Sequence, residues 1–305
     1  MILDDWVGEQ YAPLRMTDEA VEFVKANHTR PFFLYLPFIE PHVAMHPPRE
    51  WVERFPKEWD DEAYRGQCGY LPHPRPRAGY AAMIALLDHH VGRVLDALDQ
   101  AGIAERTLVV FTSDNGTTHA HAGDPRFHVG GVDARFFNST RGLRGYKGSL
   151  YEGGIRVPMI ARLPGQIAAG SVNETPGYFA DWFPTLCDAA RLEQPAGLDG
   201  QSLWPEMTGT AAPPGRNAMV WVFPEYGGQA AVRLGQYKMI RQGLKTKMPG
   251  PWEVYDIEAD PGEQHNLAGS RSDLVQEAEM ILRREMDDNS VFPLAIPGVN
   301  TPADK

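Results

Sequence analysis

The sequence predicts an α/β fold with a parallel sheet, followed by a small antiparallel α+β subdomain. In the first two thirds of the 305 residues, helix patterns alternate with short apolar runs, as in proteins with parallel sheets. In the last third, strand patterns follow one another and end in a helix. The stretch 205–217, rich in Pro, Gly, Ala and Thr, separates the two parts. We therefore expect a larger domain over 1–212 and a C-terminal subdomain over 213–305.

The first part begins with a helix pattern and a strand pattern. TDEAVEFVKAN, residues 17–27, predicts a helix with Thr17 as its N-cap. PFFLYLPF, residues 31–38, is a nearly continuous apolar run bounded by prolines, which favours a buried strand. Apolar residues then recur at spacings of three and four over 80–101, which predicts a long helix.

Shorter elements complete the alternation. The runs 107–112 and 156–165 favour strands, and 181–192 favours a helix with Asp181 as its N-cap. The last third contains three strand patterns and one helix pattern, near 218–223, 230–240, 252–257 and 272–287. These elements predict an antiparallel sheet with one helix packed on it.

Composition excludes some classes of protein. Hydrophobic residues make up 43% and charged residues 23%, which is typical of a soluble globular protein. The net charge of −11 argues against a general nucleic-acid binder. No stretch approaches the roughly 18 apolar residues of a membrane helix, and the N-terminus shows no signal peptide. We expect neither nucleic acid nor membrane as a partner, and the compartment stays unknown.

The stretch TLVVFTSDNG, residues 107–116, ends an apolar run in Asp114, Asn115 and a glycine. Because ligands of parallel sheets bind beyond the carboxyl ends of strands, these side chains are candidate ligands. Carboxylate and amide oxygens suit a hard cation such as Ca²⁺ or Mg²⁺. A simple strand-terminating turn explains the same three residues. This stretch alone leaves both interpretations open.

The stretch 135–156 concentrates positive charge within an acidic chain. Its only acidic residue is Glu152, and its basic residues are Arg135, Arg141, Arg144, Lys147 and Arg156. Interleaved glycines would let the backbone approach an anion closely. The alternative is a solvated basic loop.

Histidines gather just before this stretch. His119, His121 and His128 lie near Asp114 and Asp124 in the sequence. Imidazole and carboxylate ligands together would suit zinc. The spacing is not diagnostic, and polar loop histidines explain it equally.

Four segments together resemble the sulfatase family, and specifically arylsulfatase-like members. The segments are RPFFLYLPFIEPH, TLVVFTSDNG, LRGYKGSLYEGGIRVPMIARLPGQI and WEVYDIEADPGEQHNL. Their order and spacing match over nearly the whole chain. The resemblance implies an alkaline-phosphatase-like mixed sheet flanked by helices. It also implies a small C-terminal subdomain with a four-stranded sheet and a helix.

The resemblance assigns roles to individual residues. Asp114 and Asn115 match the pair that contributes half of a Ca²⁺ site, for which Mg²⁺ is the second choice. Lys147 matches a lysine that contacts the sulfate and assists the leaving oxygen, and His42 matches a histidine that points at the sulfate. Arg144 is a further candidate for holding the anion. The implied substrate is a sulfate-ester small molecule or a sulfated carbohydrate.

A related activity competes with this assignment. Zinc-dependent phosphodiesterases and phosphatases of the same superfamily tend to carry Asp-His where this chain has Asp114-Asn115. Imidazole suits zinc, whereas an amide oxygen suits calcium. Asn115 therefore favours a sulfatase, with the phosphodiesterase as the alternative.

The resemblance covers only the C-terminal two thirds of a sulfatase. The family begins with a strand that carries two aspartates and continues to a C-x-P-x-R or S-x-P-x-R motif, whose Cys or Ser becomes the catalytic formylglycine. Asp4-Asp5 lies too close to the 17–27 helix to match that strand. Cys187 falls within a predicted helix, and Cys68 has proline at the wrong offset. The precursor of formylglycine is therefore absent from these residues.

Three interpretations follow from this absence. The chain could be a truncated sulfatase that is inactive alone, one piece of a split protein, or a non-catalytic binder of sulfated ligands. We expect the first, with negligible activity until the N-terminal segment is supplied. A sheet without its first strand exposes an edge, so we also expect self-association.

Overall fold

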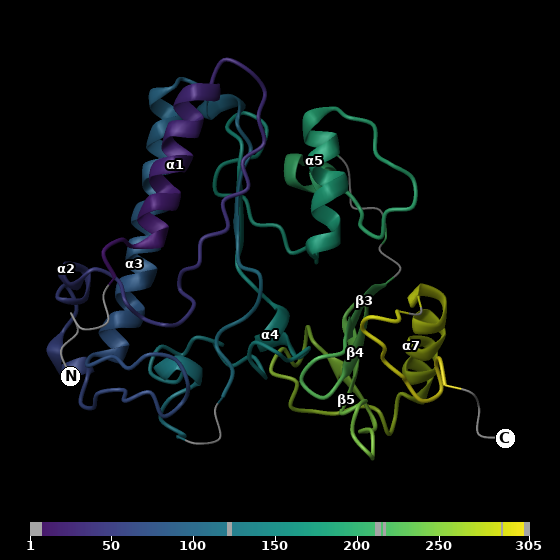
Figure 1. Ribbon diagram of the computed structural model, residues 1–305. Helices are drawn as coiled ribbons and strands as arrows, with labels where there is room; N and C mark the ends of the chain where they lie inside the picture. The colour runs from purple at the N-terminus through teal and green to yellow at the C-terminus, as the bar shows by residue number, and fades with distance from the viewer. Residues whose placement is uncertain (1–7, 121–123, 211–214, 216–217, 288, 302–305) are drawn as a thin grey trace. The chain divides into compact units, whose positions relative to one another are not determined.

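A computed structural model describes residues 8–120, 124–210, 215, 218–287 and 289–301 (Figure 1). The chain forms two compact units that interleave along the sequence. The first contains residues 1–109, 118–139 and 162–165, and the second contains 110–117, 140–161 and 166–305. The expected division between 212 and 213 stays a prediction, because residues 211–214 lie outside the described residues.

Two long helices dominate the first unit. Helices α1 (Ala12–Asn27) and α3 (Pro76–Gln100) lie side by side (Figure 1). Both expected helices are confirmed, but each begins earlier than predicted. Thr17 is not an N-cap: it is fully buried inside α1, and its Oγ1 donates a hydrogen bond to the Pro13 carbonyl at 2.7 Å. The helix begins before Pro13 because proline lacks an N–H and fits the first turn.

Shorter helical segments surround this pair in the first unit. They are α2 (Arg49–Val52), η2 (Lys57–Trp59), η3 (Ala104–Arg106) and η4 (Val129–Gly131). The core between α1 and α3 is built from aliphatic side chains, namely Val24, Ala97, Leu98, Ile103 and Ala104.

The expected buried strand at 31–38 is wrong. No strand is assigned to this segment, and its side chains alternate in burial. Phe32 and Leu34 pack against the α1–α3 core, whereas Phe33 and Tyr35 are 71% and 75% exposed. A continuous apolar run is typical of a strand that is buried on both faces. Such burial requires packing elements on both faces, and this segment is covered on one face only. These exposed aromatic rings support the expected self-association, which stays a prediction.

Two of the predicted strands form a small two-stranded sheet. Strands β1 (Val109–Thr112) and β2 (Met159–Arg162) pair with each other, which confirms strands within 107–112 and 156–165. The predicted helix at 181–192 is also confirmed as α5 (Trp182–Ala190). Asp181 lies at its N-cap position but does not cap it: its carboxylate accepts hydrogen bonds from Tyr178 N and Gln201 N instead. The other helical segments of the second unit are α4 (Glu152–Ile155), η5 (Phe179–Asp181) and α6 (Trp204–Thr208).

A four-stranded antiparallel sheet and one helix form the C-terminal part of the second unit. The strands are β3 (Met219–Phe223), β4 (Gln229–Leu234), β5 (Tyr237–Gln242) and β6 (Trp252–Asp256), in the order β3-β4-β5-β6. Helix α7 (Ser272–Glu285) packs on this sheet (Figure 1). The predicted antiparallel sheet and its helix are confirmed, except that 230–240 is a hairpin rather than one strand.

The two faces of this sheet pack against different partners. Val232, Met239 and Val254 share a core with α7. Their neighbours along the strands, such as Ile240, point to the other face and pack against Leu150 and Tyr151. This alternation follows from the two-residue period of a strand. The sheet therefore has a second core against the segment that follows Lys147.

Within the described residues, no helix is long and apolar enough to cross a membrane.

A buried histidine makes the stability of the first unit pH-dependent. His90 on α3 is 1% exposed, and its ring stacks on Phe38 with a centroid distance of 6.0 Å. Burial, together with the neighbouring charges of His89 and Arg93, lowers the pKa of His90 to about 4. An unfolded histidine binds a proton near pH 6.5. Between pH 6.5 and 4, His90 therefore binds a proton in the unfolded chain but not in the folded chain. The free energy of unfolding consequently falls as the pH decreases.

We expect wild type to lose about 2 kcal/mol more unfolding free energy than the His90→Leu variant between pH 7.5 and pH 5. Urea unfolding at both pH values measures this difference. The comparison with the variant is essential because Glu40 acts in the opposite direction: burial raises its pKa to about 7. Identical pH dependence of the two proteins would contradict the prediction.

Candidate functional site

The Asp114-Asn115 pair lies in a turn directly after β1, as predicted. Ser113 Oγ donates a hydrogen bond to the Asn115 carbonyl at 2.9 Å, and Gly116 N donates one to the Gly154 carbonyl at 2.9 Å. Asp114 is exposed. Among the described residues, no ion pair or hydrogen bond is recorded for its carboxylate. The backbone of the turn is thus fixed while the carboxylate stays available to a ligand.

The donor set of this turn suits a hard cation. Ca²⁺ is bound by six to eight oxygen atoms, and Asp114 and Asn115 offer a carboxylate and an amide oxygen. Within the described residues there is no group of three or more His, Cys, Asp and Glu side chains that could hold a metal. The turn can therefore supply part of a Ca²⁺ site but not all of it. The zinc interpretation stays a hypothesis, because one of its histidines, His121, lies outside the described residues.

The histidines near the turn have other contacts. His128 is 3% exposed, and its Nδ1 lies 2.9 Å from the Thr118 carbonyl. The Asp124 carboxylate accepts hydrogen bonds from Arg126. His121 lies outside the described residues.

The Lys147 loop lies against the Asp114-Asn115 turn. Lys147 N donates a hydrogen bond to the Thr117 carbonyl at 2.7 Å. The side chain of Lys147 is half-buried, and no ion pair is recorded for it among the described residues. The structure therefore brings the Lys147 loop to the residue that follows the Asp114-Asn115 turn, although Thr117 and Lys147 are 30 residues apart in the sequence.

Glycines make this close approach possible. A Cβ atom added to Gly116 would lie 2.0 Å from the Gly153 carbonyl oxygen, and one added to Gly153 would lie 2.3 Å from the Gly145 carbonyl oxygen. No side chain fits at either position. The glycines of the KGSLYEGG stretch thus allow backbone contacts between the turn and the loop.

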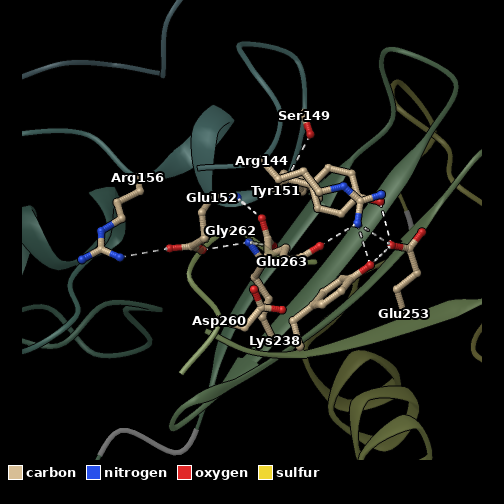
Figure 2. Close-up of polar contacts among 12 residues, drawn as sticks. Arg144, Ser149, Tyr151, Glu152, Arg156, Lys238, Glu253, Asp260, Gly262 and Glu263 are labelled. Atoms are coloured by element: carbon tan, nitrogen blue, oxygen red, sulfur yellow. Dashed lines mark hydrogen bonds and ion pairs between the residues drawn. The ribbon is translucent and has the colours of Figure 1, made fainter. Parts of the chain in front are cut away.

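Arg144 contacts protein groups extensively. Its Nη1 donates hydrogen bonds to Tyr255 Oη at 2.6 Å, the Glu263 carbonyl at 3.1 Å and Glu253 Oε2 at 3.4 Å (Figure 2). Its guanidinium also lies over the Tyr151 ring, 3.9 Å from the centroid. Only Nε and Nη2 are then left to contact an anion. The predicted sulfate contact of Arg144 stays a prediction.

His42 lies in the first unit, after the 31–38 segment. It is exposed, and its Nδ1 lies 2.7 Å from the Val43 carbonyl. A carbonyl can only accept, so Nδ1 carries the proton of this contact and Nε2 of the neutral ring holds a lone pair. The Tyr70 ring packs edge-on against His42 at a centroid distance of 5.9 Å. This arrangement leaves Nε2 available to a ligand.

Sequence reasoning missed three buried charged residues beside this site. Glu152, Lys238 and Glu263 are 4%, 0% and 1% exposed and lie in contact with one another (Figure 2). Two signals were present in the sequence. Glu152 is the only acid in a basic stretch, and Lys238 directly precedes the apolar Met239 and Ile240 within a strand pattern.

Comparison with known proteins identifies the family. The family model described as Sulfatase matches residues 6–192. The chain belongs to the sulfatase family. A second model, described as N-sulphoglucosamine sulphohydrolase, C-terminal, matches residues 145–290 and covers the C-terminal sheet and helix.

Individual sulfatases and solved structures show the extent of the similarity. The steryl-sulfatase of Mus musculus is 34% identical over 199 residues, which cover 65% of this chain and 28% of that protein. The crystal structure of Ps i-CgsB in complex with k-i-k-neocarrahexaose has a TM-score of 0.72 at 27% identity and covers 91% of this chain and 55% of that one. The structure of BT4656 in complex with its substrate D-glucosamine-2-N,6-O-disulfate has a TM-score of 0.52 at 27% identity, over 68% of this chain and 40% of that one.

These similarities confirm the alkaline-phosphatase-like α/β fold. The sulfatase chain spans 28% of the steryl-sulfatase and about half of the two structures.

Proposed function

We propose that this sulfatase-family chain provides the metal-binding and sulfate-binding part of a sulfuric ester hydrolase. The observation that carries the proposal is the 2.7 Å hydrogen bond from Lys147 N to the Thr117 carbonyl. It places the backbone of a cationic loop against a turn with a free carboxylate. A cation and an ammonium group held near each other can neutralise the oxygens of a sulfate ester.

Asp114 and Asn115 would hold Ca²⁺, with Mg²⁺ as the second choice. The exposed carboxylate and the amide oxygen fit such a cation. When bound, it would supply Lewis-acid stabilisation of the sulfate oxygens.

Lys147 and His42 would act on the sulfate ester itself. The Lys147 ammonium would contact the sulfate and donate a hydrogen bond or a proton to the leaving oxygen as the S–O bond breaks. His42 would contact the sulfate through Nε2, because its Nδ1 is engaged by the Val43 carbonyl. Arg144 would add a weaker contact through Nε or Nη2. Sulfated carbohydrates are the favoured substrate class, since BT4656 has such a substrate.

The catalytic nucleophile would not come from the two cysteines of this chain. Cys187 lies within α5 and is 9% exposed, and Cys68 is 1% exposed. Burial raises the pKa of the Cys68 thiol, which keeps it protonated and unreactive. We therefore expect negligible turnover by the 305 residues alone.

A complementation experiment tests the proposal. The chain is expressed alone and together with an N-terminal sulfatase segment that carries C-x-P-x-R, which we term the complemented protein. Both are assayed with p-nitrophenyl sulfate and with bis-p-nitrophenyl phosphate. We expect Ca²⁺-dependent sulfate-ester turnover by the complemented protein only. Zinc-dependent turnover of the phosphate diester would favour the phosphodiesterase alternative instead.

The Asp114→Ala variant tests the metal site. We expect it to lower the Ca²⁺ affinity of the complemented protein by about 100-fold, because it removes the only charged ligand that this turn offers. Calorimetric titration with CaCl₂ measures the affinity. Glu174→Ala is the matched control, since Glu174 is also exposed and lies in the same unit. Equal affinities of the two variants would refute the assignment of Asp114.

A further inference from the structure

A buried lysine lies on the face of the C-terminal sheet that meets the Lys147 loop. Lys238 in β5 is 0% exposed. Its Nζ donates a hydrogen bond to Glu152 Oε1 at 2.8 Å and forms an ion pair with Glu263 Oε1 at 2.7 Å (Figure 2). A buried ammonium is costly unless it is paired and hydrogen-bonded. Lys238 therefore requires both carboxylates, and each carboxylate requires Lys238.

Glu263 fixes Glu152 a second time. Its Oε2 accepts a hydrogen bond from Glu152 N at 2.8 Å. Glu263 comes from the DPGE turn that follows β6, and it is 1% exposed. Both the backbone amide and the carboxylate of Glu152 are thus held by residues of the C-terminal subdomain. Arg156 adds only a distant contact, 3.9 Å from Glu152 Oε2.

Glu152 is the first residue of α4, and the next two residues contact the candidate site. Gly153 N donates a hydrogen bond to the Arg144 carbonyl at 2.7 Å, at the start of the Lys147 loop. Gly154 O accepts the 2.9 Å hydrogen bond from Gly116 N, in the Asp114-Asn115 turn. A short series of contacts therefore connects Lys238 with both halves of the site.

The close packing of the glycines couples the position of Glu152 to the positions of the Lys147 loop and the Asp114-Asn115 turn. Gly153 lies so near Gly145 and Gly116 that no Cβ atom fits between them. Since the backbones are in contact, a shift of Glu152 moves the loop or the turn rather than a flexible side chain. Arg144 adds a second attachment through its hydrogen bond to the Glu263 carbonyl.

We propose that Lys238 and Glu263 are positioning residues for the sulfate site. Through Glu152 they hold the Lys147 loop against the Asp114-Asn115 turn, so the C-terminal sheet determines the geometry of that site. Their importance for catalysis rests on the proposed function, whereas the placement of the loop is measurable without turnover. Neither residue contacts the substrate in this proposal.

The Lys238→Met variant tests the proposal. It keeps the length of the side chain but leaves two buried carboxylates facing each other without a cation. Hydrogen exchange followed by mass spectrometry is measured on the chain alone. We expect about tenfold faster exchange in peptides that cover 112–118 and 144–151, with unchanged exchange in α7. In the complemented protein we expect kcat to fall about tenfold or more, with little change in KM.

Two further variants complete the experiment. Lys247→Met is the matched control, because Lys247 is exposed in the same subdomain. Adding Glu263→Gln to Lys238→Met removes one of the facing carboxylates, so we expect it to restore slow exchange in part. If Lys238→Met simply unfolded the chain, adding Glu263→Gln would not slow exchange selectively in the peptides that cover 112–118 and 144–151.

Three outcomes decide the proposal. Wild-type exchange at 112–118 and 144–151 in Lys238→Met would overturn it. Equally faster exchange throughout the second unit, without recovery in the double variant, would overturn it as well. Glu152, Lys238 and Glu263 would then be a purely structural cluster. Selective loosening combined with no turnover by the complemented wild type would support positioning while refuting the proposed function.

Discussion

Replacement of Gly116 by alanine is expected to separate the Asp114-Asn115 turn from the Lys147 loop. The new Cβ would lie 2.0 Å from the Gly153 carbonyl oxygen and 2.9 Å from its carbonyl carbon. Backbone atoms cannot rotate away as a side chain can, so the hydrogen bond from Gly116 N to the Gly154 carbonyl must break. We expect about 1–3 kcal/mol of destabilisation from overpacking.

The same substitution is expected to weaken Ca²⁺ binding by about 10- to 100-fold in the complemented protein, as for other residues that orient metal ligands. Urea unfolding and calorimetric titration measure the two effects. Gly269→Ala is the control: its Cβ would have no heavy atom within 4 Å, and Gly269 lies in the same unit. Equal stability and Ca²⁺ affinity of the two variants would contradict the packing that we describe.

Leu282→Ala is expected to cause the largest loss of stability in the C-terminal subdomain. Leu282 on α7 is 0% exposed and packs in the core that α7 shares with the sheet. Removal of three buried carbon atoms costs hydrophobic transfer energy and leaves a cavity. We expect a loss of about 2–5 kcal/mol in unfolding free energy, measured by urea unfolding.

Met280→Ala provides the control for this prediction. Met280 lies two residues away on the same helix and is 58% exposed, so its truncation should change the stability by less than about 0.5 kcal/mol. If the two variants unfold at the same urea concentration, α7 does not pack on the sheet through Leu282. Because this subdomain supplies Lys238 and Glu263, Leu282→Ala should also accelerate exchange in the Lys147 loop.

Local patterns were sufficient for most elements of this chain. The spacing of apolar residues predicted α3, and the run before Asp114 predicted β1. The alternation of strand patterns predicted the C-terminal sheet, because the side-chain period of a strand is visible in the sequence. The family resemblance then indicated which polar residues to examine, among them Asp114 and Lys147.

Local patterns failed where a neighbour decides the outcome. The run 31–38 has the composition of a buried strand, yet Phe33 is 71% exposed. Thr17 resembles an N-cap, yet α1 begins earlier because Pro13 fits its first turn. In both cases the sequence gives the residue types but not the partner that each side chain meets.

The sequence by itself indicated the sulfatase family, most of the helices and strands, and the candidate site residues Asp114, Asn115 and Lys147. Only the tertiary structure showed what holds these ligands in place. Glu152 lies 86 residues before Lys238 and 111 residues before Glu263, and no periodicity connects positions so far apart. Such pairing is decided by the burial of charges, since a lysine enclosed in a sheet must find carboxylates wherever the fold supplies them.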